Sequence, residues 1–285
     1  MVKVLKFLIS ITITILFLYF LNKYVGFENI KRFFNDLSIF NISIAFLFYL
    51  ISYIIRSYRW SFTLDIKDFK KLFHITAINT FFNIILPFRT GEFSFFYMLK
   101  KENIHISDIT MSFITTRAFD GIGLIAILLF SYFLYIGNIL FAILSLILLP
   151  FSFYIFIFIL SFIKHEKVKE FNNKRFNFLN LVIIYLLSIL TFLFKFLAFY
   201  FVLPESLNIN IIQSFIASSG GDLTTVLPIH GIAGIGSYET GYAGILITLL
   251  NIDKNLAFIA SLFAHIFIIL SSSIIAFISY LLKKL

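Results

Sequence analysis

Two glutamates follow Pro- and Gly-containing breaks in an otherwise apolar sequence, and each break also carries a basic or titratable side chain. The first break reads Leu86-Pro87-Phe-Arg89-Thr-Gly91-Glu92, and the second reads Leu227-Pro228-Ile-His230-Gly231-Ile-Ala-Gly234-Ile-Gly236-Ser-Tyr-Glu239. We expect each glutamate to lie in the first turn of a helix that restarts after the break, where an acid stabilises the helix N-terminus. The same carboxylates are candidates for binding a cationic headgroup or for taking up protons. Both interpretations are open.

Arg89 is the leading candidate for a phosphate ligand. A guanidinium group donates two parallel hydrogen bonds to phosphate oxygens and stays charged in a dry site. The alternative is an ion pair between Arg89 and Glu92 across the turn. For His230 the two interpretations are donation to a phosphate and a bond to the turn backbone. The glycines of the second break are not followed by the Lys-Ser/Thr pair of a phosphate-binding loop, so they indicate close approach of the backbone to another helix or a ligand.

Other charged residues lie inside apolar segments. Arg117 and Asp120 are three residues apart and share one face of a helix, so they form either a structural pair or part of a cavity surface. Asp222 follows Ser-Ser-Gly-Gly in the middle of an apolar run, which we interpret as a helix break that Asp222 caps. Its depth in the membrane also makes Asp222 a candidate for substrate binding. Lys195 lies roughly eight residues from the outer end of a predicted span; snorkelling of its amino group to the membrane interface explains it, and a functional role is the alternative.

The composition indicates an integral membrane protein. The 285 residues are 60% hydrophobic and 13% charged, whereas about a quarter of a soluble chain is charged. The chain has no Cys, and its histidines lack metal-ligand spacing, so we expect no metal, no cofactor and no enzyme activity. The net charge of +9 is carried by short loops, which indicates anionic or phosphate-bearing membrane lipids as partners and no nucleic acid.

Apolar length predicts how the chain crosses a bilayer whose hydrocarbon core is roughly 30 Å thick. Six segments are long enough to span it: 4–21, 40–59, 109–135, 139–162, 179–203 and 256–282. The first resembles a signal peptide but lacks a small-residue cleavage site, so we expect it to remain as a span. The regions 72–100 and 211–250, which contain the two breaks, are too short or too interrupted to cross. We predict that each is a re-entrant helical hairpin.

The distribution of the 23 Lys and Arg residues tests this topology. With a cytoplasmic N-terminus, the expected outer loops hold only Lys23, Lys31, Arg32 and Lys254. Because cytoplasmic loops are enriched in Lys and Arg, we expect a multi-pass plasma (cytoplasmic) membrane protein with both termini in the cytoplasm. The predicted fold is all-α, a single transmembrane domain over 1–285 with inverted repeats at about 40–135 and 179–282. Its two hairpins should meet near the midplane and line a cavity.

Three segments resemble a known family. They are the two breaks, 86–92 and 227–239, and Thr116-Arg117-Ala-Phe-Asp120 between them. Together they are similar to the transmembrane region of lysylphosphatidylglycerol synthases and its stand-alone relatives, the flippase-like family, over about 40–282. The chain departs from that family at Phe95, where relatives often have Arg, and at Thr116, where they often have Glu. Its 285 residues leave no room for the soluble synthase domain, so the resemblance implies lipid handling without the synthase reaction.

The main functional hypothesis is translocation of a phospholipid or polyprenyl-linked lipid between leaflets by a flippase or scramblase. Arg89 and Arg117 would hold the phosphate, and Glu92 and Glu239 would contact the rest of the headgroup or take up protons. One alternative is a secondary transporter of a small soluble solute, with the same geometry but no lateral opening. Another is a non-transporting partner of a lipid-modifying enzyme. The sequence is compatible with a homo-oligomer.

Overall fold

Long apolar helices dominate the computed structural model, which describes residues 2–64, 66–86, 89–151, 178–225 and 231–284. None of these residues forms a β-strand. Helices satisfy their backbone hydrogen bonds internally, which is what a chain requires in hydrocarbon, where water cannot pair with free N–H and C=O groups. The all-α prediction is confirmed, and the chain is a polytopic membrane protein.

Four helices have the length and apolar composition of membrane spans. They are α3 (Ile39–Arg59), α6 (Ile106–Tyr135), α10 (Phe178–Phe201) and α13 (Lys254–Lys284). These match four of the six expected spans.

The other two expected spans are not among these four helices of the described residues. The segment 4–21 lies in α1 (Val2–Tyr24), which qualifies only together with α2 (Phe27–Asn35), after a bend of 81°. Of the segment 139–162, α7 (Ile139–Leu148) is a short apolar helix, and residues 152–162 lie outside the described residues. The described residues therefore hold four spans, or five if the bent pair counts as one.

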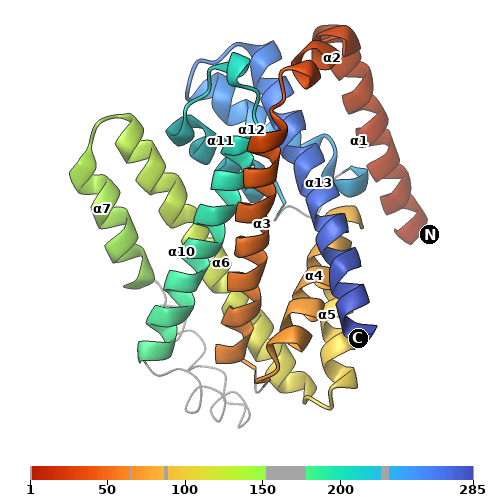
Figure 1. The fold of residues 1–285 in the computed structure, drawn as a ribbon, viewed down its shortest axis with the longest axis vertical. Helices are drawn as coiled ribbons and strands as arrows, with labels where there is room; N and C mark the ends of the chain where they lie inside the picture. The colour runs from red at the N-terminus through yellow and green to blue at the C-terminus, as the bar shows by residue number, and fades with distance from the viewer. Residues whose placement is uncertain (1, 65, 87–88, 152–177, 226–230, 285) are drawn as a thin grey trace.

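Shorter helices lie between the spans in two pairs. The first helix pair is α4 (Phe69–Ile85) and α5 (Glu92–Lys101), and the second is α11 (Ile211–Thr224) and α12 (Ser237–Thr248), preceded by the short helix η5 (Ile232–Gly234). The two members of each pair pack on one another. In Figure 1 the first helix pair extends from the lower end of the molecule toward its middle, and the second lies in the upper part.

An ion pair joins the start of α4 to the end of α5 in the first helix pair. Lys71 Nζ lies 2.6 Å from Glu102 Oε2, so the start of α4 is held beside the end of α5. The hydrogen bond to Glu102 raises the pKa of Lys71. At the start of the second helix pair a neutral cap takes this place: Asn210 caps α11 and exchanges hydrogen bonds with Gln213.

The Ser-Ser-Gly-Gly run does not break α11, so that prediction is wrong. The helix continues to Thr224, and Asp222 lies inside it instead of capping it. A Cβ atom on Gly220 would lie 2.8 Å from the carbonyl oxygen of Gly241, and one on Gly241 would lie 2.6 Å from that of Gly220. The small residues therefore let α11 and α12 cross in backbone contact, as is common between helices in membranes.

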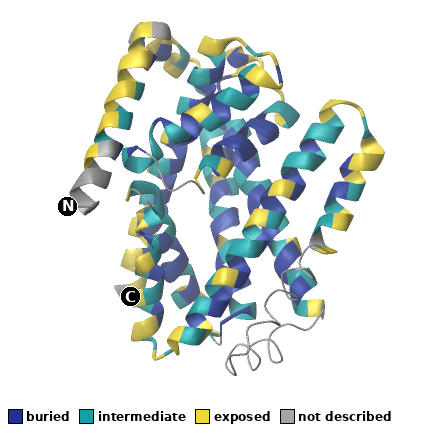
Figure 2. Cartoon of the chain, turned by 180° about the vertical axis from the view of Figure 1, so that it is seen from behind, coloured by how far each residue is buried: buried dark blue, intermediate teal, exposed yellow. Residues whose placement is uncertain are grey.

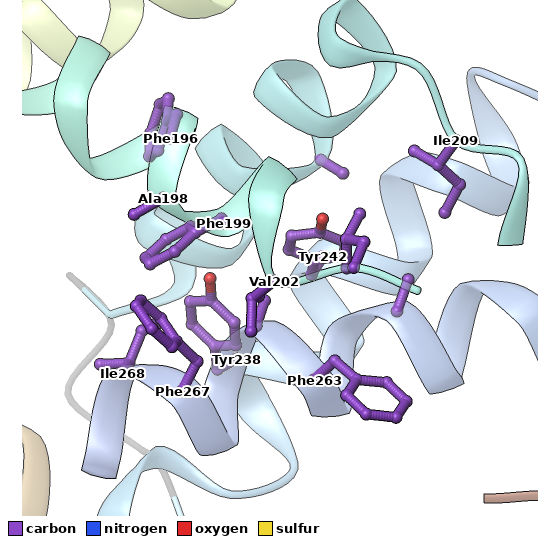
Figure 3. Packing of buried hydrophobic residues seen from close by; sticks show 14 of the residues in the cluster. Phe196, Ala198, Phe199, Val202, Ile209, Tyr238, Tyr242, Phe263, Phe267 and Ile268 are labelled. Carbon is purple, nitrogen blue, oxygen red and sulfur yellow. The ribbon is translucent and has the colours of Figure 1, made fainter. Parts of the chain in front are cut away.

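The largest apolar cluster lies where α3, α10, α12 and α13 meet. Figure 3 shows Phe199 of α10 gathered with Tyr238 and Tyr242 of α12 and with Phe267 of α13. The same spans also hold the short helices, because α4 packs against α13 and α11 packs against α6. Each helix pair is thus packed against a span from the other half of the chain.

Outward-facing positions are apolar too. On α13 the exposed side chains include Leu270, Ile274 and Phe277, whose spacing of four and three residues places them on one helix face. Figure 2 shows further exposed residues along α1 and α7. Exposed apolar faces of this extent are the expected contact surface with lipid tails.

Candidate functional site

A cavity of about 430 Å³ lies between the two helix pairs and the surrounding spans. Its lining includes residues of all four spans and of both helix pairs. The volume lies in the range of small-molecule sites, roughly 300–1,000 Å³. A second hollow of about 420 Å³ lies at the α2–α3 connection, and its described lining has Asp36 and Glu205 but no basic side chain.

Charged side chains are concentrated in the larger cavity. The basic lining residues are Arg56, Arg59, Arg89, Arg117 and Lys195, and the acidic ones are Glu92, Asp120 and Asp222. Charged groups within membrane-spanning proteins are rare and usually face an interior cavity or one another. The cavity therefore brings together five of the predicted site residues, from α5, α6, α11 and the turn before α5.

Residues 89–91 of the first break form a turn that leads into α5, and Arg89 and Glu92 line the cavity. Arg89 Nε lies 3.1 Å from Glu92 Oε1, so the ion-pair interpretation is confirmed. The backbone of Arg89 is left-handed, with φ 53°. Gly91 is required for packing, because a Cβ atom there would lie 2.3 Å from the backbone nitrogen of Asn83. Asn79 donates a 3.2 Å hydrogen bond to the Gly91 carbonyl. Pro87 lies outside the described residues.

The predicted Arg117–Asp120 pair is present and is part of a larger network. Arg117 Nη1 lies 3.3 Å from Asp120 Oδ2, and Arg117 Nη2 lies 3.4 Å from Glu92 Oε1. Arg59 Nη1 makes a shorter contact of 2.6 Å with Asp120 Oδ1. Sequence reasoning missed Arg56 and Arg59 as site residues, because both lie at the end of the predicted span 40–59, where basic residues are expected on the cytoplasmic side. The structure places both on α3 in the cavity wall.

Lys195 does not snorkel to an interface, so that interpretation is wrong. Its Nζ lies 2.6 Å from Asp222 Oδ2 and 2.8 Å from Oδ1, and the two side chains are 16% and 6% exposed. Packing of α10 against α11 brings the pair together. The carboxylate of Asp222 therefore balances the charge of the buried Lys195 ammonium group.

The described part of the second break, residues 231–239, contacts His265 through Glu239 and Ala233. Glu239 is 1% exposed, and its Oε2 accepts a 2.7 Å hydrogen bond from the backbone N–H of Gly236, which caps α12. Its Oε1 lies 2.6 Å from Nδ1 of His265, and Nε2 of His265 lies 2.9 Å from the carbonyl oxygen of Ala233. His265 was missed by sequence reasoning, because nothing in the sequence links it to Glu239.

The two contacts of His265 fix the proton count of the pair. A carbonyl oxygen only accepts, so Nε2 carries a proton. The contact between Nδ1 and Glu239 Oε1 then needs a second proton, on either the imidazole or the carboxyl group. In both cases the pair has no net charge. His265 lines the cavity, whereas Glu239 is not among its lining residues.

The glycines of the second break allow close approach, as predicted. A Cβ atom on Gly231 would lie 2.7 Å from Oγ1 of Thr14 on α1, and Thr14 Oγ1 accepts a 2.9 Å hydrogen bond from the N–H of Ile232. Gly234 and Gly236 have φ of 78° and 93°. Pro228 and His230 lie outside the described residues.

No metal site is formed by the residues that the structure describes, since no group of three or more His, Cys, Asp or Glu comes together there. Charged side chains of the cavity lining form ion pairs with one another.

The exposed residues of the cavity lining lie toward the middle of the molecule. They are Leu86 at the end of α4, Gly121 in the middle of α6, and Thr225 at the end of α11. On α6, Ile114 and Ile125 are also exposed, and their spacing from Gly121 places all three on one helix face. The cavity lining therefore includes exposed residues on α6 and at the described inner ends of α4 and α11.

Comparison with known proteins assigns the chain to a family of membrane regions. The family model described as lysylphosphatidylglycerol synthase TM region matches residues 5–276, which include every charged residue of the cavity. No curated protein matches the chain.

Proposed function

The chain belongs to the lysylphosphatidylglycerol synthase transmembrane-region family, and from that premise we propose that it moves a phosphate-bearing lipid between membrane leaflets, as a flippase or scramblase. The observation that carries the proposal is the cavity, which combines five cations and three carboxylates with an exposed edge beside the apolar face of α6. A lipid needs both features, because its headgroup is polar and its tails are not.

The placement of the helix pairs supports a lipid path. We propose that they are re-entrant hairpins that enter from opposite faces and belong to inverted repeats. Each pair packs against the final span of the other repeat, with α4 on α13 and α11 on α6, and the first spans α3 and α10 pack on each other. This reciprocal packing is the pattern expected around an approximate two-fold axis, and in inverted-repeat transporters the binding site lies near the midplane between the repeats.

Lys and Arg residues support an orientation with the C-terminus in the cytoplasm. The connections after α3 and after α5 lie at the lower end of Figure 1, where α13 also ends. Those connections and the neighbouring helix ends carry Lys67, Lys70, Lys100 and Lys101. The last turn of α13 carries Lys283. By the enrichment of basic residues in cytoplasmic loops we propose that this end faces the cytoplasm of a plasma membrane protein.

The cavity would lower the energy of a headgroup in transit. Transfer of an isolated ion into hydrocarbon costs of the order of tens of kcal/mol, so passage requires groups that replace water. Arg89 and Arg117 would donate to the phosphate, and Glu92 would contact any cationic part of the headgroup. The tails would remain in the bilayer beside Gly121. Glu239 would act indirectly, by holding His265 in the cavity wall.

Leaflet exchange in proteoliposomes tests this function. Vesicles containing a headgroup-labelled anionic lipid and the purified protein should expose inner-leaflet label to a membrane-impermeant quencher faster than empty vesicles do. Arg117→Gln should slow exchange, whereas Arg32→Gln on α2, outside the cavity, should not. Exchange at the rate of empty vesicles, across several anionic and polyprenyl lipids, would contradict lipid translocation and favour a soluble solute.

A further inference from the structure

Arg59 is a buried cation whose hydrogen-bonding capacity is only partly used. Its side chain is 1% exposed, and Nη1 donates to both Asp120 Oδ1 (2.6 Å) and Ser188 Oγ (2.5 Å). Its Nε and Nη2 are buried and have no hydrogen-bond partner among the described residues. Buried polar groups in folded proteins nearly always have partners. The two unpartnered nitrogens, which carry three N–H groups, therefore point to an acceptor supplied by a ligand.

Two further arginines that line this cavity each have a buried Nε without a partner among the described residues. Arg56 lies three residues before Arg59 on α3, and its Nε is buried without a partner. Arg117 reaches the cavity from α6, and its Nε is likewise unpartnered in the described part of the chain. No ion pair of Arg56 is found within the described residues, whereas Arg59 and Arg117 both contact Asp120.

The charge balance of the cavity leaves these arginines in excess. Lys195 is balanced by Asp222, and the Glu239–His265 pair has no net charge. The remaining carboxylates are Glu92, which contacts Arg89 and Arg117, and Asp120, which contacts Arg59 and Arg117. Four guanidinium groups thus share two carboxylates in the described lining. Two positive charges are left uncompensated, which is the charge that a bound dianion would neutralise.

We propose that Arg56, Arg59 and Arg117 bind a doubly charged phosphate group, so that the lipid carried is a phosphomonoester or diphosphate and not a phosphodiester. A phosphomonoester carries about −1.5 to −2 charges at pH 7 and three strong acceptor oxygens. A phosphodiester carries one charge and fewer free oxygens. Guanidinium groups pair with phosphate oxygens through forked hydrogen bonds. This inference rests on the proposed function for the claim that the phosphate belongs to a lipid.

Lipid binding by the purified full-length protein tests the inference. The probes are phosphatidic acid, a phosphomonoester, phosphatidylglycerol with the same acyl chains, and inorganic phosphate, each titrated in detergent and followed by native mass spectrometry or thermal shift. Phosphatidic acid should bind about tenfold more tightly than phosphatidylglycerol, the effect of roughly one charged hydrogen bond. Arg56→Gln should weaken phosphatidic acid binding about tenfold and change phosphatidylglycerol binding much less.

Arg56 is the informative position because its substitution breaks no ion pair of the described residues. Arg59→Gln leaves Asp120 with a weaker partner, so its thermal unfolding has to be measured beside its binding. Arg32→Gln on α2 is the matched control, since it removes the same charge outside the cavity, and it should bind like the wild type.

Four results would distinguish failure of the dianion site from failure of lipid translocation. Equal affinity for phosphatidic acid and phosphatidylglycerol, or an Arg56→Gln variant that binds like wild type, would overturn the dianion site. Inorganic phosphate that binds as tightly as phosphatidic acid, with the same dependence on Arg56, would support the dianion site and overturn lipid translocation. Selective phosphatidic acid binding without leaflet exchange in vesicles would likewise support the dianion site and overturn lipid translocation.

Discussion

The turn that precedes α5 and the turn that precedes α12 have two structural features in common. Each contains a non-glycine residue with left-handed backbone, Arg89 (φ 53°) in the first and Ala233 (φ 54°) in the second. Each is followed by a helix with a glutamate in its first turn, Glu92 or Glu239. The sequence suggests that the two glutamates are equivalent, but their surroundings differ.

The difference lies in what each carboxylate binds. Glu92 is 24% exposed, makes no cap and contacts two arginines that face the cavity. Glu239 is 1% exposed, and its two oxygens are used by the Gly236 N–H and by His265. One pattern of Gly and Glu therefore supports two roles, a charged surface in the first helix pair and an internal scaffold in the second.

The largest expected effect is on stability, at the second turn. Glu239→Ala should lower the free energy of unfolding by about 3–5 kcal/mol, because it breaks a buried pair and leaves an N–H of Gly236 and the ring of His265 without partners. Glu92→Ala should cost less than about 1 kcal/mol, since its ion pairs are partly exposed. Thermal unfolding in one detergent measures both. Equal destabilisation by the two variants would remove the distinction between the turns.

The next effect is on transport, at the first turn. Arg117→Gln should reduce the rate of leaflet exchange by about 10- to 100-fold, the loss of one or two charged hydrogen bonds to the headgroup. Its unfolding temperature should change far less than that of Glu239→Ala. Exchange rates normalised to folded protein test this. A loss of exchange that merely follows the loss of folded protein would contradict a binding role for Arg117.

Backbone packing gives a third test within the first turn. Gly91→Ala should cost about 1–3 kcal/mol of stability, because the added methyl group meets the backbone of α4. Gly244→Ala on α12 is the matched control, since no atom lies within 4 Å of an added Cβ there, and it should be neutral or stabilising. If both substitutions are tolerated equally in thermal unfolding, the turn before α5 is not held against α4 as described.

The smallest effects concern the starts of α4 and α11, the first helices of the two helix pairs. Asn210→Ala should cost about 1 kcal/mol, because it removes the cap of α11, whereas Lys71→Gln should have little effect on an exposed pair. The pKa of Lys71 is raised in the folded protein. The stability that the Lys71–Glu102 pair contributes is therefore fully present below the ordinary lysine pKa, and it is lost as pH rises through the higher folded pKa. Unfolding between neutral and strongly alkaline pH should show this loss in wild type and not in Lys71→Gln.

Local features of the site were predictable from the sequence. Arg89–Glu92 and Arg117–Asp120 are each three residues apart, so helix or turn geometry alone brings them together. Apolar length likewise identified α3, α6, α10 and α13. These predictions needed no knowledge of which helices are neighbours.

Features that depend on packing between helices were not predictable. Asp120 is reached by Arg59, 61 residues away, Lys195 by Asp222, 27 residues away, and Glu239 by His265, 26 residues away. The Gly220-Gly221 pair suits both a broken helix and a close crossing, and only the position of Gly241 opposite Gly220 decides between them. The sequence holds no signal for such tertiary neighbours.

The central claim, that a headgroup enters the charged cavity while its tails stay outside beside α6, can be tested with photoreactive lipid. Phosphatidic acid with a diazirine at the headgroup end or at mid-tail would be cross-linked to wild-type protein in vesicles and mapped by peptide mass spectrometry. We predict headgroup adducts on the segments around Arg56 and Arg117, and tail adducts near Leu86 and on the α6 face that contains Ile114, Gly121 and Ile125. Adducts confined to the outer faces of α7 and α13 for both probes would contradict the account.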